Sequence, residues 1–284
     1  MKAAVLGSPI GHSLSPVLHG AAYAALGLHD WSYAAIECDE AGLPGLIASC
    51  DGDWAGLSLT MPLKRAVLPL LDYTDPLASG CEAANTVIFR AGSRHGYNTD
   101  VHGMVAALKE ASAPAPRSVT ILGAGATACS ALAALRDLGV DGADVMVRDP
   151  ARAGVLLAAA RKLALRVRLR SFGEPEDRAP DLLISTLPPG AADFYTERMV
   201  RSPSAPAAVL DVVYSPWPTP LAAAAAAAGA AVAGGFAMLL HQAAAQVELM
   251  TARPAPLPAM RSAGEAELLR RSAHQSELRR HSTP

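Results

Sequence analysis

The chain has 284 residues, of which 51% are hydrophobic and 18% are charged. This composition provides for buried cores and excludes overall disorder, and the length permits one large domain or two medium ones. The formal net charge of −2 argues against a general nucleic-acid or membrane-surface binder.

Residues 3–7 predict a short strand that ends in a turn rich in glycine, proline and serine. Ser15 stands before Pro16, which predicts that Ser15 caps a helix reaching to about Leu26. Ser13 lies two residues before Ser15, and in extended chain that spacing places both hydroxyls on one side. The two serines either belong to a capped polar turn or receive an anionic group such as a carboxylate, and the spacing leaves both interpretations open.

The following segments alternate between strand-like and helix-like patterns. Residues 31–37 and 55–60 predict strands, and residues 40–49 predict a helix between them. This alternation indicates a mostly parallel α/β lobe. Lys64 follows the strand at 55–60, where open α/β sheets place their ligands, although a lone lysine is usually solvated surface.

Residues 86–90 and 95–98 flank a turn and predict a hairpin. The hairpin leads to Asp100 at the start of a helix over residues 101–110, where an aspartate is by default a cap. Residues 112–117 contain two prolines, which predicts a linker.

The strongest motif follows an apolar strand over residues 119–122 and places Gly123, Gly125 and Ala128 before a helix-like segment. In such a G-x-G-x-x-A turn, the first glycine permits a tight turn, the second lets the backbone approach a pyrophosphate, and the alanine keeps helix and strand close. The N–H groups that open the helix then face the phosphates. We therefore predict a dinucleotide-binding turn, with the residues before it forming a separate lobe.

The strand over residues 143–147 bears on the choice of cofactor. An acidic residue at the end of this strand is typical of NAD enzymes, where it binds the ribose hydroxyls. Here the strand is followed by Arg148 and Asp149, with Arg152 nearby. The two arginines favour a 2′-phosphate and hence NADP. Asp149 favours NAD, unless it only caps the helix that starts near Pro150.

The last third of the chain is predicted to contain strands at residues 181–185 and 207–212, followed by helices at residues 219–228 and 236–251. Met238 and Gln242 are four residues apart and share a helix face, which is more often core than site. Residues 261–284 are charged and predict a solvated helix and a frayed tail. Interspersed glutamates argue against a nucleic-acid arm.

Several of these segments together resemble the shikimate dehydrogenase family over roughly residues 3–270. Their order and spacing carry the resemblance, and the segments besides the glycine turn are Val5–Pro16 (VLGSPIGHSLSP), Gly56–Lys64 (GLSLTMPLK), Ala83–Thr86 (AANT), Asn98–Gly103 (NTDVHG), Asp211–Leu221 (DVVYSPWPTPL) and Gly235–Gln242 (GFAMLLHQ).

The resemblance implies an α/β fold of two lobes with the active site in the cleft between them. Residues 1–100 would form a mostly parallel substrate-binding and catalytic domain, completed by helices over residues 236–270. Residues 101–235 would form a Rossmann-type NADP-binding domain. Residues 271–284 lie beyond the resemblance and are expected to form a flexible tail.

The resemblance also implies roles for individual residues. Lys64 and Asp100 would be the catalytic pair. The substrate carboxylate and hydroxyls would be held by Ser13, Ser15, Thr60, Asn85 and Gln242, with Tyr214 close by. The cofactor would be bound by Gly123, Ala124, Gly125, Ala126, Thr127, Arg148, Arg152, Thr186 and Met238.

The implied activity is the reversible, NADPH-dependent reduction of 3-dehydroshikimate to shikimate, a step toward chorismate and the aromatic amino acids. One alternative is a quinate/shikimate or aminoshikimate dehydrogenase that uses NAD. A second alternative is a dinucleotide-binding sensor without catalysis. A sensor would be expected to lack one member of the catalytic pair, whereas this chain has both Lys64 and Asp100.

The chain departs from the family pattern mainly outside the catalytic pair. Ser58 stands where the family usually shows asparagine, Glu82 and Ala126 stand where glycine is usual, Val147 replaces an asparagine, and Asp149 replaces a small hydroxyl residue. These departures bear on cofactor preference and affinity more than on fold or reaction.

The four cysteines form no C-x-x-C pair, and no histidine or cysteine cluster has ligand spacing, so we expect reduced thiols and no metal site. The first residues predict no secretory leader, and the apolar run at 221–233 is too short to cross a bilayer. We expect a cytoplasmic monomer or homodimer that acts on a small molecule rather than on nucleic acid or membranes.

Overall fold

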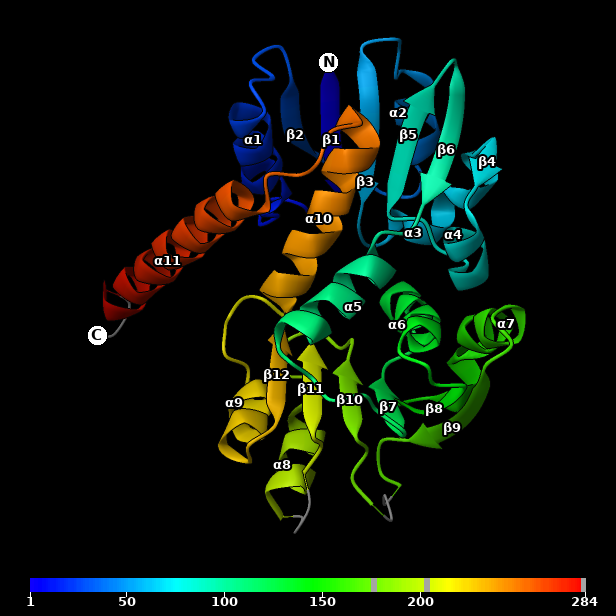
Figure 1. Cartoon of the computed structure of the whole chain (residues 1–284), viewed down its shortest axis with the longest axis vertical. Coiled ribbons are helices and arrows are strands. Elements are labelled where there is room, and N and C mark those ends of the chain that lie inside the picture. Colours follow the sequence, from blue (N-terminus) through cyan, green and yellow to red (C-terminus); the bar gives the residue numbers. More distant parts are fainter. Residues whose placement is uncertain (175–177, 202–204, 282–284) are drawn as a thin grey trace.

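The computed structural model describes residues 1–174, 178–201 and 205–281, with side chains described up to residue 274. It contains two lobes, each built on its own six-stranded sheet, stacked one above the other (Figure 1). This two-lobed α/β arrangement is the one predicted from the sequence.

The first sheet has the strand order β2-β1-β3-β5-β6-β4. Its strands are β1 (Lys2–Gly7), β2 (Ser32–Glu37), β3 (Trp54–Leu59), β4 (Tyr73–Thr74), β5 (Thr86–Arg90) and β6 (Ser93–Tyr97). Strand β1 pairs in parallel with β2 and β3, whereas β5 and β6 form the predicted antiparallel hairpin. The helical segments of this part of the chain are α1 (Ser15–Ala25), α2 (Leu43–Ala48), α3 (Leu63–Ala66), η1 (Leu68–Leu70) and α4 (Pro76–Cys81).

The second sheet is parallel throughout, with the order β12-β11-β10-β7-β8-β9. Its strands are β7 (Val119–Leu122), β8 (Gly142–Val147), β9 (Arg166–Ser171), β10 (Leu182–Ser185), β11 (Ala208–Asp211) and β12 (Ala231–Gly234). The accompanying helical segments are α5 (Asp100–Glu110), α6 (Ala126–Asp137), η2 (Pro150–Arg152), α7 (Gly154–Lys162), α8 (Asp193–Arg201) and α9 (Pro220–Ala227). Three strands on each side of the β10–β7 boundary give the doubly wound topology of dinucleotide-binding sheets.

Two caps differ from the sequence prediction. Ser15 does not cap α1, because the helix begins at Ser15 itself and no side chain caps it; instead the Ser15 N–H donates to Ser13 Oγ at 3.2 Å. Asp100 is the first residue of α5 rather than its cap, and its carboxylate is engaged elsewhere. Both side chains are therefore available for roles other than helix capping.

Helix α10 (Gly235–Thr251) leaves the second sheet after β12 and runs back alongside the first lobe (Figure 1). Gly103 of α5 lets the two helices approach closely: a Cβ at this position would lie 2.6 Å from the Met238 carbonyl oxygen and 2.9 Å from Gln242 Cβ. This approach brings Gln242 to the start of α5.

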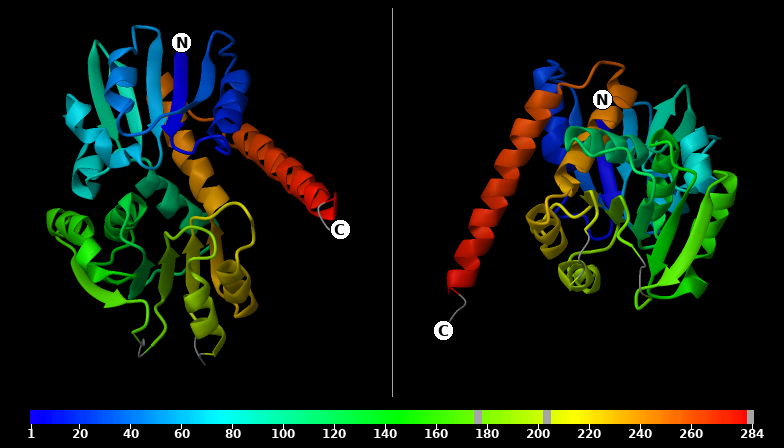
Figure 2. Two further views of the ribbon diagram at one scale, coloured as in Figure 1. Left: turned by 180° about the vertical axis from the view of Figure 1, so that it is seen from behind. Right: turned by 60° about the horizontal axis from the view of Figure 1, so that its bottom comes forward.

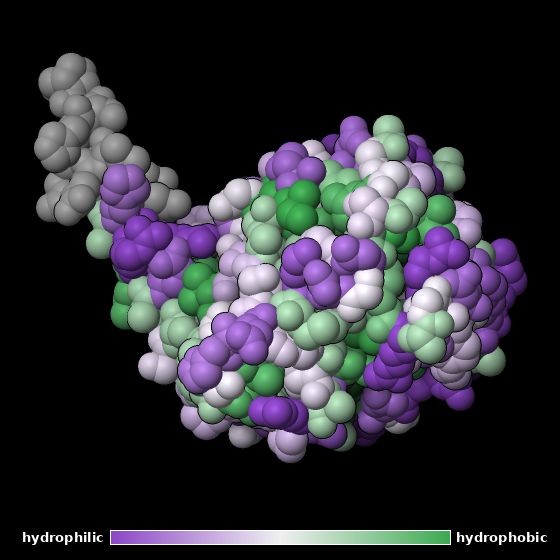
Figure 3. All heavy atoms as spheres, turned by 90° about the horizontal axis from the view of Figure 1, so that it is seen from above, coloured by the Kyte–Doolittle hydropathy of each residue, from purple (hydrophilic) through white to green (hydrophobic). Residues whose placement is uncertain are grey.

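Helix α11 (Leu257–His281) packs against α1 and α10 and then extends away from both lobes (Figure 2). Gly264 makes the contact tight, because a Cβ there would lie 2.6 Å from Phe236 Cε2 and 2.8 Å from Leu18 Cδ2. Residues 271–281, which the sequence analysis placed in a flexible tail, continue this helix. Seen from above (Figure 3), hydrophilic residues predominate where α11 leaves the body. Among the described residues, no helix is long and apolar enough to cross a membrane.

Candidate active site

A cavity of about 300 Å³ lies where the carboxyl ends of β1 and β3 meet the second lobe and α10. Its lining includes all the predicted catalytic and substrate-binding residues: Lys64, Asp100, Ser13, Ser15, Thr60, Asn85, Tyr214 and Gln242. These residues come from segments far apart in the sequence. The two-lobed fold therefore brings together at one place the residues that the resemblance selected.

At the centre of the cavity, Lys64 Nζ lies 2.6 Å from Asp100 Oδ2. The side chains are 13% and 5% exposed, respectively, so the pair is largely shielded from water. Lys64 is carried by α3 directly after β3, and Asp100 opens α5. A buried ion pair is stable only when its remaining polar atoms are also paired. Asp100 meets this condition, because Asn85 Nδ2 donates to its second oxygen at 2.8 Å.

Asn85 connects the ion pair to α10. Its Nδ2 also donates to Gln242 Oε1 at 3.2 Å, and its Oδ1 accepts from the Thr99 N–H at 2.8 Å. Gln242 Nε2 donates to the Leu239 carbonyl at 3.0 Å. The amide groups of Asn85 and Gln242 are thus held in defined orientations, as a site that recognises hydroxyl groups requires.

Sequence reasoning missed the polar network behind these residues. Ser58 Oγ donates to Gln246 Oε1 at 2.8 Å, and Tyr33 Oη donates to Ser58 Oγ at 2.7 Å. Ser58 and Gln246 both line the cavity. His19 lies deeper, stacked on Tyr33 and hydrogen-bonded to Gln246. The signal that could have revealed Gln246 is its position four residues after Gln242, on the same face of one helix.

The predicted cofactor turn has the expected strand–turn–helix form between β7 and α6. Gly123 adopts a φ of 106°, which favours glycine, and a Cβ there would lie 2.6 Å from Thr186 Oγ1. Gly125 is the N-cap of α6, and the helix has no side-chain cap. Its first N–H groups are therefore free of a capping side chain and fit an anionic phosphate group. Of the predicted cofactor residues, Thr127 and Met238 line the cavity, which thus reaches the turn.

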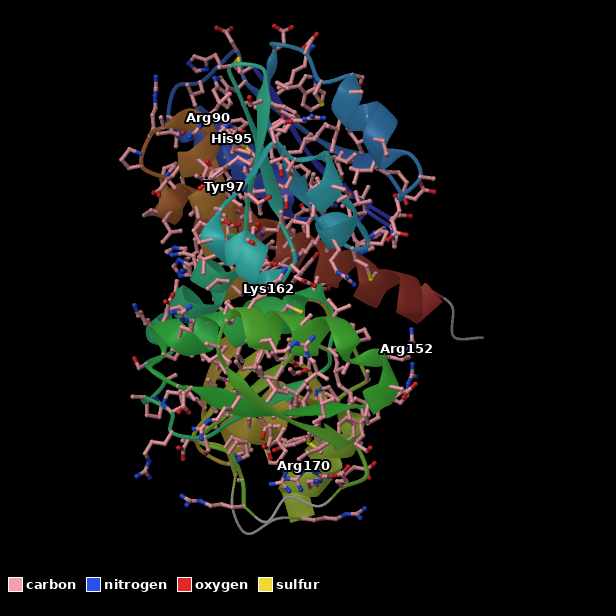
Figure 4. The ribbon with its side chains drawn as sticks, turned by 90° about the vertical axis from the view of Figure 1, so that its right-hand side faces the viewer. Arg90, His95, Tyr97, Arg152, Lys162 and Arg170 are labelled. Atoms are coloured by element: carbon pink, nitrogen blue, oxygen red, sulfur yellow. The ribbon has the colours of Figure 1, made fainter. Side chains whose placement is uncertain are left out.

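Arg148 and Arg152 lie outside the cavity, after the carboxyl end of β8, and both are exposed. Arg152 stands at the edge of the second lobe (Figure 4). Asp149 caps η2, with its Oδ1 accepting from the Ala151 N–H at 3.0 Å. Asp149 could either bind the ribose hydroxyls of NAD or cap a helix, and in the structure its side chain caps η2. The exposed guanidinium groups fit a phosphate on the adenosine side of a dinucleotide.

A larger hollow of about 650 Å³ lies at the opposite edge of the second sheet, where β7, β8 and β9 begin. Its arginines include Arg166, 2.6 Å from Asp141, and Arg170, 3.0 Å from Asp144. Arg170 is labelled near the bottom of Figure 4, in the second lobe. Ligands of open parallel sheets bind outside the carboxyl ends of the strands, so the smaller cavity is the candidate active site.

The chain is similar to known proteins over most of its length. The model of the shikimate dehydrogenase substrate binding domain matches residues 5–87, and that of the shikimate 5'-dehydrogenase C-terminal domain matches residues 235–263. The chain is 38% identical to the shikimate dehydrogenase (NADP(+)) of Citrifermentans bemidjiense over 280 residues, covering 94% of this chain and 95% of the relative.

Solved structures of shikimate dehydrogenases are also similar to this chain. The crystal structure of Mycobacterium tuberculosis shikimate dehydrogenase is similar with a TM-score of 0.83 and 40% identity, over 93% of this chain and 99% of that one. The Thermus thermophilus shikimate 5-dehydrogenase, in complex with NADP(H) and shikimate, has a TM-score of 0.79 and 33% identity, over 94% and 99% of the two chains.

Proposed function

This chain belongs to the shikimate dehydrogenase family, and on that basis we propose that it catalyses the reversible, NADP-dependent interconversion of 3-dehydroshikimate and shikimate. The observation that carries the proposal is the shielded Lys64–Asp100 pair in a cavity that extends to the glycine turn. The reduction serves the shikimate pathway, which leads to chorismate and the aromatic amino acids. A non-catalytic sensor would have no need of such a pair.

Lys64 is the acid and base of the proposed reaction. Bound NADPH would supply the hydride to the ring carbonyl carbon. Lys64 donates a proton to the carbonyl oxygen as negative charge develops there, and the product is a hydroxyl group. In the reverse direction neutral Lys64 accepts that proton. Asp100 orients the lysine through the 2.6 Å contact, and Asn85 holds Asp100 in place.

The remaining cavity residues bind and orient the substrate. The Ser13 and Ser15 hydroxyls hold the carboxylate, and Thr60 adds a hydrogen bond to a ring hydroxyl. Asn85 and Gln242 bind the other hydroxyls, since their amides already lie side by side. Tyr214 closes the side next to the second lobe.

The cofactor is assigned to the second lobe. The turn formed by Gly123, Ala124, Gly125, Ala126 and Thr127 would hold the diphosphate, because the start of α6 has no side-chain cap. Arg148 and Arg152 bind the 2′-phosphate, with Asp149 retained as a cap. Met238, which lines the cavity, would contact the nicotinamide. Thr186 would support the turn, because its hydroxyl donates to the Leu122 carbonyl at 2.7 Å.

The same reasoning divides the chain into domains. Residues 1–100, with helices from 236–270, form the substrate domain, and residues 101–235 form the NADP domain. We infer a cytoplasmic monomer or homodimer, supported by the free state of Cys38, Cys50, Cys81 and Cys129, which is typical of reducing compartments.

Initial rates followed by nicotinamide absorbance test the proposal. Purified protein receives shikimate or quinate, each with NADP⁺ and with NAD⁺. Turnover confined to shikimate with NADP⁺ is the expected result. Comparable rates with NAD⁺ would contradict the role of the two arginines, and comparable rates with quinate would contradict the substrate assignment. No turnover by folded protein with any pair would contradict an enzymatic function.

A further inference from the structure

The loop between β1 and α1, residues 8–14, is held by a side chain from the far end of the chain. Arg271 of α11 donates from Nη1 to the His12 carbonyl at 2.6 Å and from Nη2 to the Ser13 carbonyl at 3.4 Å. Its Nε donates to Glu267 Oε1 at 2.6 Å, one helical turn earlier. Arg271 is therefore fixed on both sides, by its own helix and by the loop.

The same loop lines the candidate active site through His12 and Ser13. Its other end is held by Glu37, whose Oε2 accepts from the Ile10 N–H at 3.0 Å. Ser13 Oγ in turn accepts from the Ser15 N–H. Movement of the His12 and Ser13 carbonyls would therefore displace the hydroxyls of both serines.

Helix α11 makes the contacts that such a support requires. Met260, Gly264, Glu267 and Arg271 lie on one face, at spacings of four, three and four residues. Met260 is fully buried, and Gly264 packs against α1, the helix that follows the loop. The contact face is thus anchored by packing at one end and by Arg271 at the other.

The charge of Arg271 also affects Tyr214, a residue of the second lobe. Burial raises the pKa of Tyr214, and the positive charge of Arg271 opposes this increase. Tyr214 belongs to the second lobe and lines the cavity. The positive charge of Arg271 therefore acts on a cavity residue of the second lobe as well as on the loop.

We propose that Arg271 is a positioning residue for substrate binding: by holding the His12 and Ser13 carbonyls, it keeps Ser13 and Ser15 directed at the substrate carboxylate. The inference rests on the proposed function. It assigns a role to α11 beyond residue 270, where the family resemblance ends.

The chain offers a matched control in Arg270. Both arginines bind Glu267, but Arg270 is 69% exposed and Arg271 25% exposed, and only Arg271 contacts the loop. Full-length Arg271→Gln, Arg271→Lys and Arg270→Gln proteins are compared with the unmodified chain. Thermal unfolding verifies that each is folded, and kcat and KM are measured for shikimate and for NADP⁺.

We expect Arg271→Gln to raise the KM for shikimate about tenfold, because a charge-assisted contact to the loop is lost. The kcat and the KM for NADP⁺ should change less than about twofold, since substrate and transition state lose the same binding contact. Arg271→Lys should recover part of the loss, because an ammonium can still donate to one carbonyl. Arg270→Gln should behave like the unmodified chain.

An unchanged KM for shikimate in folded Arg271→Gln would overturn the inference, and so would an equal increase in Arg270→Gln. If the unmodified chain does not turn over shikimate at all, the proposed function fails and the inference fails with it. An active unmodified chain with an unaffected Arg271→Gln variant overturns the inference alone.

Discussion

At the scale of single residues, the chemistry depends on how completely a few polar groups are paired. Lys64 and Asp100 face each other with little access to water, and Asn85 occupies the second oxygen of the carboxylate. Low local dielectric strengthens such contacts and makes any unpaired member costly. Substitutions of Lys64 or Asp100 should therefore lower kcat much more than they weaken cofactor binding, because the cofactor turn belongs to the other lobe.

Lys64→Ala is expected to lower kcat by about 10²- to 10⁴-fold, the usual contribution of a positioned acid or base. The dissociation constant for NADP⁺ should change little, because α6 and its turn are untouched. Arg65→Ala is the matched control, since Arg65 is the next residue of α3 and is exposed. Steady-state rates and titration of cofactor binding check the result. A Lys64→Ala protein that retains most of its activity would refute the assignment.

His19 predicts a pH dependence of stability. Burial lowers its pKa from 6.5 to about 3, against a smaller opposing effect of its hydrogen bond to Gln246. Below pH 6.5 the unfolded chain takes up a proton at this position while the folded chain does not. The contribution of His19 to the free energy of unfolding is therefore fully present above pH 6.5 and is lost as the pH falls toward 3. Between these values the free energy of unfolding falls by up to about 1.4 kcal/mol per pH unit.

Denaturant unfolding at several pH values between 4 and 8 measures this contribution by comparison of the unmodified chain with His19→Gln. Subtracting the two curves removes the common effect of the carboxylates. The difference in unfolding free energy should shrink as the medium becomes more acidic, because only the unmodified chain must keep a buried imidazole neutral. Parallel curves would be incompatible with the lowered pKa.

At the scale of secondary-structure elements, the site depends on how closely helices approach. Gly103 allows α5 and α10 to meet with backbone almost in contact, and this approach places Gln242 beside Thr99, the residue before Asp100. Gly264 has the same function between α11 and α1. Small residues at such crossings determine where the polar side chains of each helix stand.

Gly103→Ala should lower the thermal stability and kcat, because its Cβ would meet the Met238 carbonyl at 2.6 Å and force the two helices apart. Gly20→Ala is the matched substitution within α1, where a Cβ would meet nothing within 4 Å. Because alanine favours helix, Gly20→Ala should stabilise the protein by about 0.5–1 kcal/mol. Calorimetric melting of both variants checks the contrast, and two equal shifts would contradict it.

The limits of sequence prediction also appear at this scale. The patterns around β1, β3, the hairpin, β7 and α10 were recovered because each combines apolar periodicity with a distinct turn. Strand β9 was missed because Arg166, Arg168 and Arg170 occupy every second position, which is the pattern of a solvent-exposed face. Helix α8 was missed because four charged residues interrupt the apolar positions of its nine-residue sequence, DFYTERMVR.

Within the site, the residues that local pattern and family resemblance could identify lie directly after strands or at helix starts. Lys64, Asp100 and the glycine turn belong to this group. Gln246 and Arg271 do not, because their partners Ser58 and Ser13 lie far away in the sequence. The spacing from Gln242 indicates the helix face of Gln246 but not its contact with Ser58, and no spacing indicates Arg271, so only the folded chain reveals these contacts.

At the scale of the whole molecule, the two lobes contact each other behind the cavity. Lys162 of α7 lies 2.7 Å from Glu82 at the end of α4 (Figure 4 labels Lys162 between the lobes). Gly80 of α4 packs against Leu163, where a Cβ would lie 2.7 Å from Cδ2. Helix α10 joins both lobes on another side. The site thus lies between bodies connected through several elements rather than one linker.

The return of α10 and α11 to the first lobe has a consequence for synthesis on the ribosome. The second lobe is translated as one continuous stretch and can fold once it emerges from the exit tunnel. The first lobe begins to emerge earlier, yet its cavity is completed only by Gln242 and Gln246 of α10, which follow the whole second lobe in the sequence. The substrate site therefore cannot assemble until the second lobe and α10 have been made, and contacts of such long sequence separation make this docking the slow step of folding.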